Sequence, residues 1–197
     1  MFMRDQTGFT SLTVLPVSPR EAPGRSGGRG LLGGARVETD RGWMDVRSVM
    51  PGMRIATLDG GFALLRGLSA RLTGGRETAV TIPGGALGNC ADLTVMPGSG
   101  ILLSDPLAED LFGSADVIVP AAALCGHRGI GCGEVPQGQA VVELHFDAEE
   151  AVYANTGVLL HMEPAGGRDR PSDFTWLTEA QARALIALAA REVRLAA

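Results

Sequence analysis

Three side chains that commonly bind metal ions lie close together in one glycine-rich stretch, at Cys125, His127 and Cys132. A structural zinc site needs four such ligands in a recognised spacing. This spacing fits no common zinc pattern and no fourth ligand is evident, so the sequence favours a glycine-rich turn with incidental thiols. We therefore expect no metal and no other cofactor. A small metal or redox site at these three residues is the alternative.

Nucleophilic chemistry needs a thiol or hydroxyl beside a base. Cys90 follows a turn-like sequence and Ser26 lies in the N-terminal segment, and either would need His127 or His145 as its base. A cysteine in a turn is more often a structural or simply exposed thiol. His161, the third histidine, follows a strand-like apolar run, where a surface or half-buried position is the usual one.

The composition excludes several classes of partner. The formal net charge is −5, the pI is near 5.2, and no cluster of Lys or Arg is dense enough to follow a phosphate backbone, so we expect no nucleic acid. No stretch approaches the roughly 20 apolar residues that cross a bilayer, and the N-terminus does not read as a signal peptide. Three cysteines are an odd number, which favours free thiols in a reducing compartment. The sequence thus predicts a soluble, cytoplasmic protein that does not bind membranes.

The elements that must position these residues are mainly β-strands. Over residues 31–160, short apolar runs are broken by Gly, Pro, Asn and Asp, which is typical of sheet-rich domains with tight turns. Asp40, Arg41 and Gly42 supply one such hairpin turn. The clearest predicted strands are 35–39, 53–57, 79–82, 92–96, 116–119 and 140–146.

The chain divides into three predicted parts. Residues 1–30 are rich in Gly, Pro and Ser and predict a flexible N-terminal segment and linker. Residues 31–164 form the β domain, and residues 165–197 form a linker followed by an amphipathic helix. A strand over residues 9–17 that docks on the body is the less favoured alternative.

A capping box marks the start of the C-terminal helix. Thr178 and Gln181 have the spacing at which each side chain satisfies a free backbone N–H of the first turn. Leu185 and Leu188, with Ala189 and Val193, fall near one helical face. We expect this face to pack on the sheet, and a protein partner bound through the helix is the alternative. Phe174 and Trp176, just before the helix, are expected to pack against the sheet rather than to anchor a partner.

The order of several sequence blocks resembles the bacterial hedgehog/intein (Hint) domain family. The first two blocks, residues 34–46 and 50–60, resemble the family's opening strands, in which a "G-T-x-[IV]-x-T" strand precedes a "[PV]-G-D-x-[VI]-x-T-x-D" strand. Later blocks at 82–89, 93–103, 119–124, 144–147 and 152–155 follow in family order. The resemblance covers about residues 31–164. It implies a mainly β, pseudo-two-fold horseshoe of short strands, here followed by the C-terminal α-helix.

The resemblance also implies a chemistry, which is self-cleavage. In active members a Cys at the first domain position attacks the preceding carbonyl, and a buried His protonates the leaving amide nitrogen. Here the nucleophile position falls on Gly30 or Leu31, and Ser99 stands where the His of the "S-P-Q-H-R-I-L" block belongs. A further family His falls near Glu143, although His145, two residues on, would face the same side of a strand.

These departures remove the groups that self-cleavage needs. Neither Gly30 nor Leu31 carries a nucleophilic atom, and a serine hydroxyl is too weak an acid to replace imidazole at neutral pH. The chain also ends without the His-Asn pair that closes a splicing domain. We expect an inactive Hint-like domain that serves as a binding or scaffold module rather than an enzyme. The rival is an active autoprocessing protein with a non-standard nucleophile.

Overall fold

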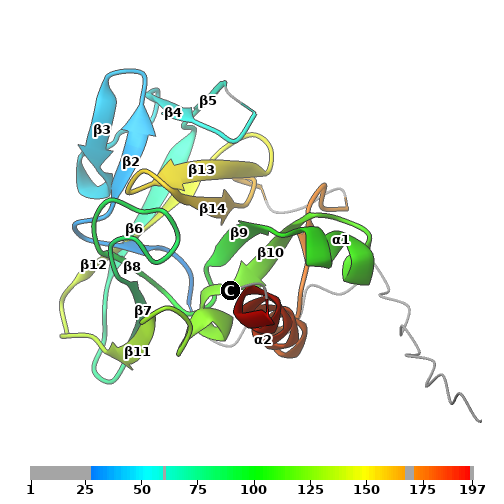
Figure 1. The fold of residues 1–197 in the computed structure, drawn as a ribbon. Helices are drawn as coiled ribbons and strands as arrows, with labels where there is room; N and C mark the ends of the chain where they lie inside the picture. Colours follow the sequence, from blue (N-terminus) through cyan, green and yellow to red (C-terminus); the bar gives the residue numbers. More distant parts are fainter. Residues whose placement is uncertain (1–27, 60, 167–170, 196–197) are drawn as a thin grey trace, which may run out of the picture.

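A computed structural model describes residues 28–59, 61–166 and 171–195. The regular structure of this part of the chain is mainly short strands (Figure 1). Along the chain the strands are β1 (Leu31–Leu32), β2 (Arg36–Thr39), β3 (Gly42–Asp45), β4 (Arg54–Ala56), β5 (Phe62–Leu64), β6 (Gly67–Leu72), β7 (Thr78–Ile82), β8 (Leu93–Val95), β9 (Gly100–Ser104), β10 (Asp116–Pro120), β11 (Gly131–Glu134), β12 (Ala140–His145), β13 (Glu150–Ala154), β14 (Val158–Met162) and β15 (Thr175–Trp176). The helices are α1 (Pro106–Phe112) and α2 (Glu179–Leu195), with short 3₁₀ helices η1 (Val46–Ser48) and η2 (Ala121–Leu124).

The strands form two curled sheets. One has the order β11-β7-β8-β1-β12-β6, and the other has the order β15-β10-β9-β14-β13-β2-β4-β5, with β3 paired to β2. β1, the first strand of the described residues, lies between β8 and β12 at the centre of its sheet. The predicted mainly β architecture with a C-terminal helix is confirmed.

All six strands predicted from the sequence are present, with bounds that differ by one or two residues. The predicted turn at Gly42 closes the β2–β3 hairpin, where Gly42 has φ of +92° and its carbonyl accepts a hydrogen bond from the Thr39 hydroxyl. Only glycine adopts such a φ without strain, which explains its place in this turn. The expected strand over residues 9–17 lies outside the described residues.

The core is built from the inward side chains of both sheets. β10 and β12 carry consecutive buried apolar residues, and the largest fully buried side chain of the described part, Phe146, follows β12 directly. Leu177, Ala182 and Leu185 from the C-terminal segment join the same cluster. The sheets and the C-terminal segment therefore share one hydrophobic core.

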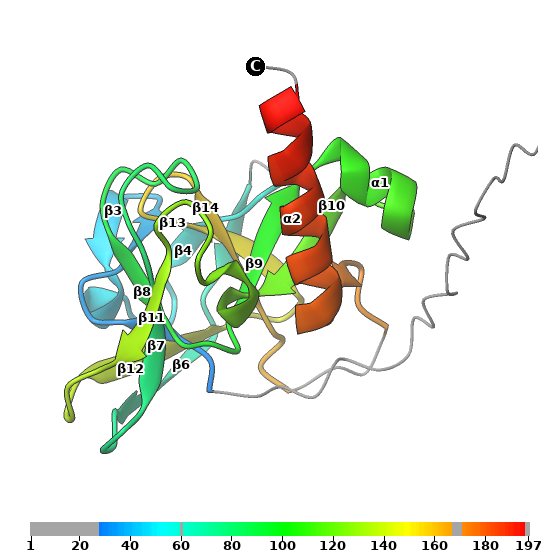
Figure 2. The same ribbon diagram turned by 60° about the horizontal axis from the view of Figure 1, so that its bottom comes forward.

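The C-terminal segment adds a strand and a helix to this body. β15 pairs in parallel with β10, and α2 lies beside η2 and β10 (Figures 1 and 2). The predicted capping box is confirmed: the Gln181 N–H donates to the Thr178 hydroxyl, and the Thr178 N–H donates to the Gln181 side chain. The helix packs through Ala182 and Leu185, so packing on the domain is confirmed.

Two expectations about the helices were wrong. Leu188 does not share the packed face, because its side chain is 40% exposed. The sequence interpretation also missed α1. The Asp105 side chain caps this helix by accepting from the Leu107 N–H, Pro106 starts it, and Gly113 ends it with φ of +77°. These three residues were the available signal.

The expectation of free cysteines was wrong for two of the three. A disulfide joins Cys125 to Cys132, whose Cα atoms lie 5.8 Å apart, while Cys90 is a free, exposed thiol. The intervening loop turns back at Gly126 and Gly129, which both have positive φ, and this turn brings the two cysteines together. The argument for a reducing compartment therefore loses its basis. Among the described residues, no helix is long and apolar enough to cross a membrane.

Candidate functional site

A pocket of about 170 Å³ opens where four segments of the fold meet. It is lined by residues 29–31 at the start of β1, by Ser99 just before β9, by residues 143–145 of β12 and by residues 160–165 at the end of β14. The two sheets meet here, since β1 and β12 belong to one and β9 and β14 to the other. The pocket brings together the three positions at which the sequence departs from the family pattern: Gly30, Ser99 and Glu143.

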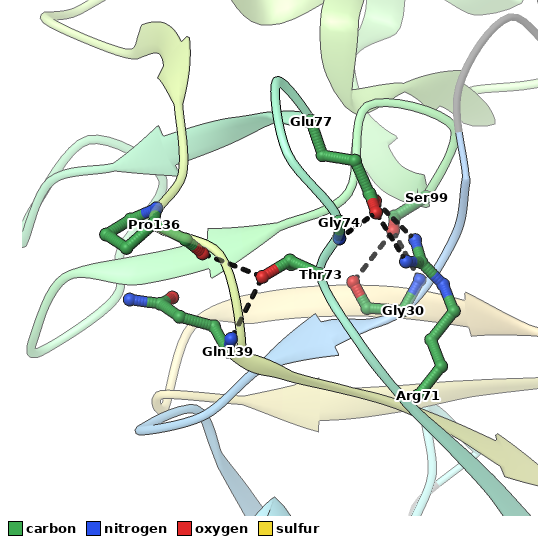
Figure 3. Close-up of polar contacts among 8 residues, drawn as sticks. All are labelled: Gly30, Arg71, Thr73, Gly74, Glu77, Ser99, Pro136 and Gln139. Atoms are coloured by element: carbon green, nitrogen blue, oxygen red, sulfur yellow. Dashed lines mark hydrogen bonds and ion pairs between the residues drawn. The ribbon is translucent and has the colours of Figure 1, made fainter.

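The Ser99 hydroxyl forms two hydrogen bonds with the backbone of Gly30. Its hydroxyl oxygen accepts from the Gly30 N–H at 3.1 Å and its O–H donates to the Gly30 carbonyl at 3.2 Å (Figure 3). The Gly30 carbonyl also accepts from the Met96 N–H at 2.9 Å, and the Gly98 N–H donates to the Gly28 carbonyl. Ser99, at the position expected for the proton donor, therefore holds the backbone of Gly30, at the position expected for the nucleophile, by hydrogen bonds.

Gly30 has no room for a side chain. Its φ is +119°, and a Cβ atom there would lie 2.7 Å from Val141 Cγ1, 2.9 Å from the Val142 carbonyl oxygen and 3.1 Å from Glu143 Cγ. Contacts under 3.0 Å require the surroundings to move. The backbone conformation at Gly30 thus excludes a nucleophilic side chain, in addition to the absence of one from the sequence.

Glu143 and His145 lie on the same side of β12, as their spacing predicts, and both line the pocket. His145 Nε2 lies 3.0 Å from the Ser69 hydroxyl on β6. Burial raises the pKa of Glu143 above its ordinary value of 4.5, an effect that His145 and Arg71 partly offset by their charge and that Glu163 reinforces. The pocket therefore disfavours a bare negative charge on Glu143.

An ion pair forms another part of the pocket wall. The Arg29 guanidinium pairs with the Glu163 carboxylate and lies 5.9 Å from the centre of the Trp176 ring. The nearby Arg71–Glu77 pair is bidentate, and Arg71 packs beside Gly28, where it would contact any added Cβ (Figure 3). The Arg29–Glu163 pair thus ties the segment before β1 to the residue that follows β14, and Arg71 lies against Gly28.

His161 is the site residue that sequence reasoning missed. We expected a surface or half-buried histidine, but its side chain is only 1% exposed, and the residue lines the pocket from β14. Its Nε2 lies 3.2 Å from the Glu149 carboxylate, which also accepts from the Ser172 hydroxyl. Phe174 and Trp176 contact the imidazole edge to face, with ring centres at 5.5 and 4.8 Å. Residues distant in sequence bury the imidazole, so no local sequence signal indicated that His161 is buried.

The alternative nucleophiles and ligands lie elsewhere or outside the described residues. Cys90 is exposed, and its Sγ accepts from the Thr156 hydroxyl at 3.0 Å away from the pocket lining. Ser26 lies outside the described residues. The metal-site alternative loses both thiolates to the Cys125–Cys132 disulfide, and the described residues contain no cluster of three or more potential metal ligands. Burial, together with the charge of Arg128, lowers the pKa of His127.

The pocket lining contains hydrogen-bonding and charged side chains. In the described pocket lining, the hydroxyl of Ser99 is the nucleophilic oxygen nearest Gly30, and both its hydrogen-bonding directions are used by the Gly30 backbone. Acid–base groups are also present in the lining, at Glu143, His145 and His161.

Comparison with known proteins identifies the fold family. No curated protein matches the chain. Among solved structures, a bacterial intein-like domain from Clostridium thermocellum superposes with a TM-score of 0.51 at 13% identity, covering 68% of this chain and 99% of that domain. A splice-inactive variant of the AceL NrdHF class 3 split intein gives a TM-score of 0.48 at 12% identity, covering 69% and 98%. The sequence pattern described as "Hint domain" matches residues 30–159, about two thirds of the chain, and this protein therefore belongs to the Hint domain family.

Proposed function

We propose that this protein is a Hint-domain protein that does not cleave its own backbone and acts as a binding or scaffold module. One observation carries the proposal. At Gly30 the backbone is held by the Ser99 hydroxyl in a conformation with φ of +119°, and neighbouring atoms occupy the space that a nucleophilic side chain would need.

The chemistry of peptide cleavage explains why this arrangement supports an inactive site. An amide is resonance-stabilised, so an acyl shift needs a nucleophile at the carbonyl and an acid that protonates the leaving nitrogen. A positioned general acid commonly contributes about 10² to 10⁴ in rate. The Gly30 N–H instead donates to Ser99, whose hydroxyl is a poor proton donor at neutral pH.

A binding role is supported by what the pocket retains. It keeps a volume of about 170 Å³ and charged walls at Arg29, Glu143 and Glu163. The outward side of α2, where Leu188 is 40% exposed, is a second surface at which a protein partner could bind.

Intact mass of the full-length chain tests the proposal. The purified protein is incubated with dithiothreitol and, separately, with hydroxylamine, which cleave or trap thioester and ester intermediates. We expect no fragment, and a gain of only two hydrogens where dithiothreitol reduces the Cys125–Cys132 disulfide. A fragment would overturn the proposal, and its new terminus would identify the residue that acts as nucleophile.

A double variant separates residue identity from backbone conformation. Gly30→Cys combined with Ser99→His restores both family groups by type. Because a Cβ at Gly30 would overlap Val141 and Val142, we expect this variant also to stay uncleaved. Cleavage of the double variant beside an intact wild type would show that residue identity alone silences the site.

A further inference from the structure

The carboxyl group of Glu143 lines the pocket without a hydrogen-bond or ion-pair partner among the described residues. Burial is the main cause of its raised pKa, which the charges of His145 and Arg71 partly offset. It is not sealed in the core, because Glu143 is half-buried and its side chain lines the pocket beside Gly30. A carboxylate in such a place is unfavourable unless a positive group compensates it.

The other ionisable side chains of the pocket each have a charged or hydrogen-bonding partner, although two buried nitrogen atoms of Arg29, Nε and Nη2, make no hydrogen bond among the described residues. The Glu163 carboxylate pairs with Arg29, His145 contacts Ser69, and His161 contacts Glu149. The remaining lining is apolar and comes mainly from Leu31, Leu144, Leu160, Met162 and Pro164. The pocket thus presents one carboxyl group that no described residue binds directly, beside several apolar side chains.

The volume sets the size of a fitting ligand. At about 30 Å³ for each water-sized group, 170 Å³ holds about six non-hydrogen atoms. We propose that the pocket binds an alkylammonium group of this size, with Glu143 as its counter-ion and the apolar wall around its methylene chain. This inference rests on the proposed binding role and names the ligand chemistry of the same site.

The charges of the wall argue against other ligands. An anion would meet the carboxylates of Glu143 and Glu163, while the charge of Arg29 is already paired with Glu163. A neutral alcohol would fill the same volume but leave the Glu143 charge uncompensated. The ammonium group would be supplied either by a small free amine or by a lysine side chain of a partner protein, since both present the same chemistry.

Titration of the full-length protein followed by NMR tests the inference. The probes are n-butylammonium, the isosteric n-butanol and butyrate, each added at constant ionic strength and pH. We expect butylammonium alone to bind, with a dissociation constant on the order of 1 mM, as befits so small a ligand. The affinities of capped lysine methylamide and of free butylamine are then compared. Tighter binding of the lysine derivative indicates a partner protein's lysine as the source of the ammonium group, and tighter binding of butylamine indicates a small free amine.

Two isosteric variants locate the counter-ion. Glu143→Gln keeps the shape of the side chain and removes its charge, so it should weaken butylammonium about tenfold to hundredfold. Glu150→Gln is the matched control, because Glu150 is also a half-buried carboxyl whose pKa is raised by burial, yet it lies outside the pocket lining. This control should bind as the wild type does.

The outcomes separate this inference from the proposed function. The alkylammonium site would be overturned if butanol or butyrate bound as well as butylammonium, if butylammonium did not bind, or if both variants lost binding equally. None of these results would affect the proposed inactivity, as long as the intact mass of the protein is unchanged. Fragments produced on addition of the amine would instead overturn the proposed inactivity, since they would require an acyl intermediate that the amine attacks.

Discussion

Replacing Gly30 by alanine would measure how strongly the structure excludes a side chain from this position. The substitution adds a Cβ at φ of +119°, which costs about 1–2 kcal/mol for an L-residue. The same atom would lie 2.7 Å from Val141 Cγ1 and 2.9 Å from the Val142 carbonyl oxygen, and such overpacking typically costs about 1–3 kcal/mol. We therefore expect Gly30→Ala to lower the free energy of unfolding by about 2–5 kcal/mol.

Gly34→Ala provides the matched control. Gly34 also has a positive φ, at +97°, but nothing lies within 4 Å of a Cβ built there. This variant should lose only the backbone part, about 1–2 kcal/mol. The difference between the two variants isolates the steric contribution around Gly30.

Urea unfolding followed by tryptophan fluorescence gives both values, because Trp43 and Trp176 lie in different parts of the described fold. The comparison requires an unchanged dependence on urea concentration, which indicates that the variant still unfolds in one step. If Gly30→Ala and Gly34→Ala are equally stable within about 0.5 kcal/mol, the space around Gly30 is not restrictive, and the argument against a nucleophile there fails.

Three further predictions concern the groups around the pocket and the disulfide. Ser99→Ala removes the acceptor of the buried Gly30 N–H and should lower the free energy of unfolding by about 1–3 kcal/mol in the same urea assay; a change within error would contradict the role of Ser99 as a fastener. Because burial raises the pKa of Glu143 in the folded state, its contribution to stability is fully present below the unfolded pKa and is lost as pH rises through the folded pKa. Glu143→Gln should therefore match the wild type in acid and exceed it near neutral pH, as thermal unfolding at several pH values would show, and a gain in acid instead would refute the sign. Cys125→Ser with Cys132→Ser opens a loop of sequence separation 7 and should cost about 2.5 kcal/mol by loop entropy, measured by urea unfolding against wild type with and without reductant.

The local patterns of the sequence predicted most of the fold. Alternating apolar runs located the six clearest strands, and the spacing of Thr178 and Gln181 located the start of α2, because these signals act within a few residues. The same locality explains the missed helix. The short α1 follows a strand without a long amphipathic period, so the Asp105 cap, Pro106 at its start and Gly113 at its end were the cues.

The site was less accessible to sequence reasoning because its contacts are long-range. The resemblance brought Gly30, Ser99 and Glu143 into consideration, but nothing local indicates that the Ser99 hydroxyl bonds to a backbone 69 residues earlier. The burial of His161 depends on Phe174 and Trp176, which reach it only when β15 joins the sheet. The disulfide likewise depends on how a glycine-rich loop folds back, which the spacing of two cysteines does not specify.

The central place of β1 has a consequence for the order in which this chain folds. Leu31 pairs with Val95 on one side and with Val142 on the other, so β1 is synthesised well before both of its partner strands, β8 and β12. Such pairings between distant residues raise the entropy that must be lost before contacts form, and they slow folding into the range of milliseconds to seconds. Until β12 is synthesised and inserted, β1 has an unpaired edge, and the nascent chain depends on protection from aggregation during that interval.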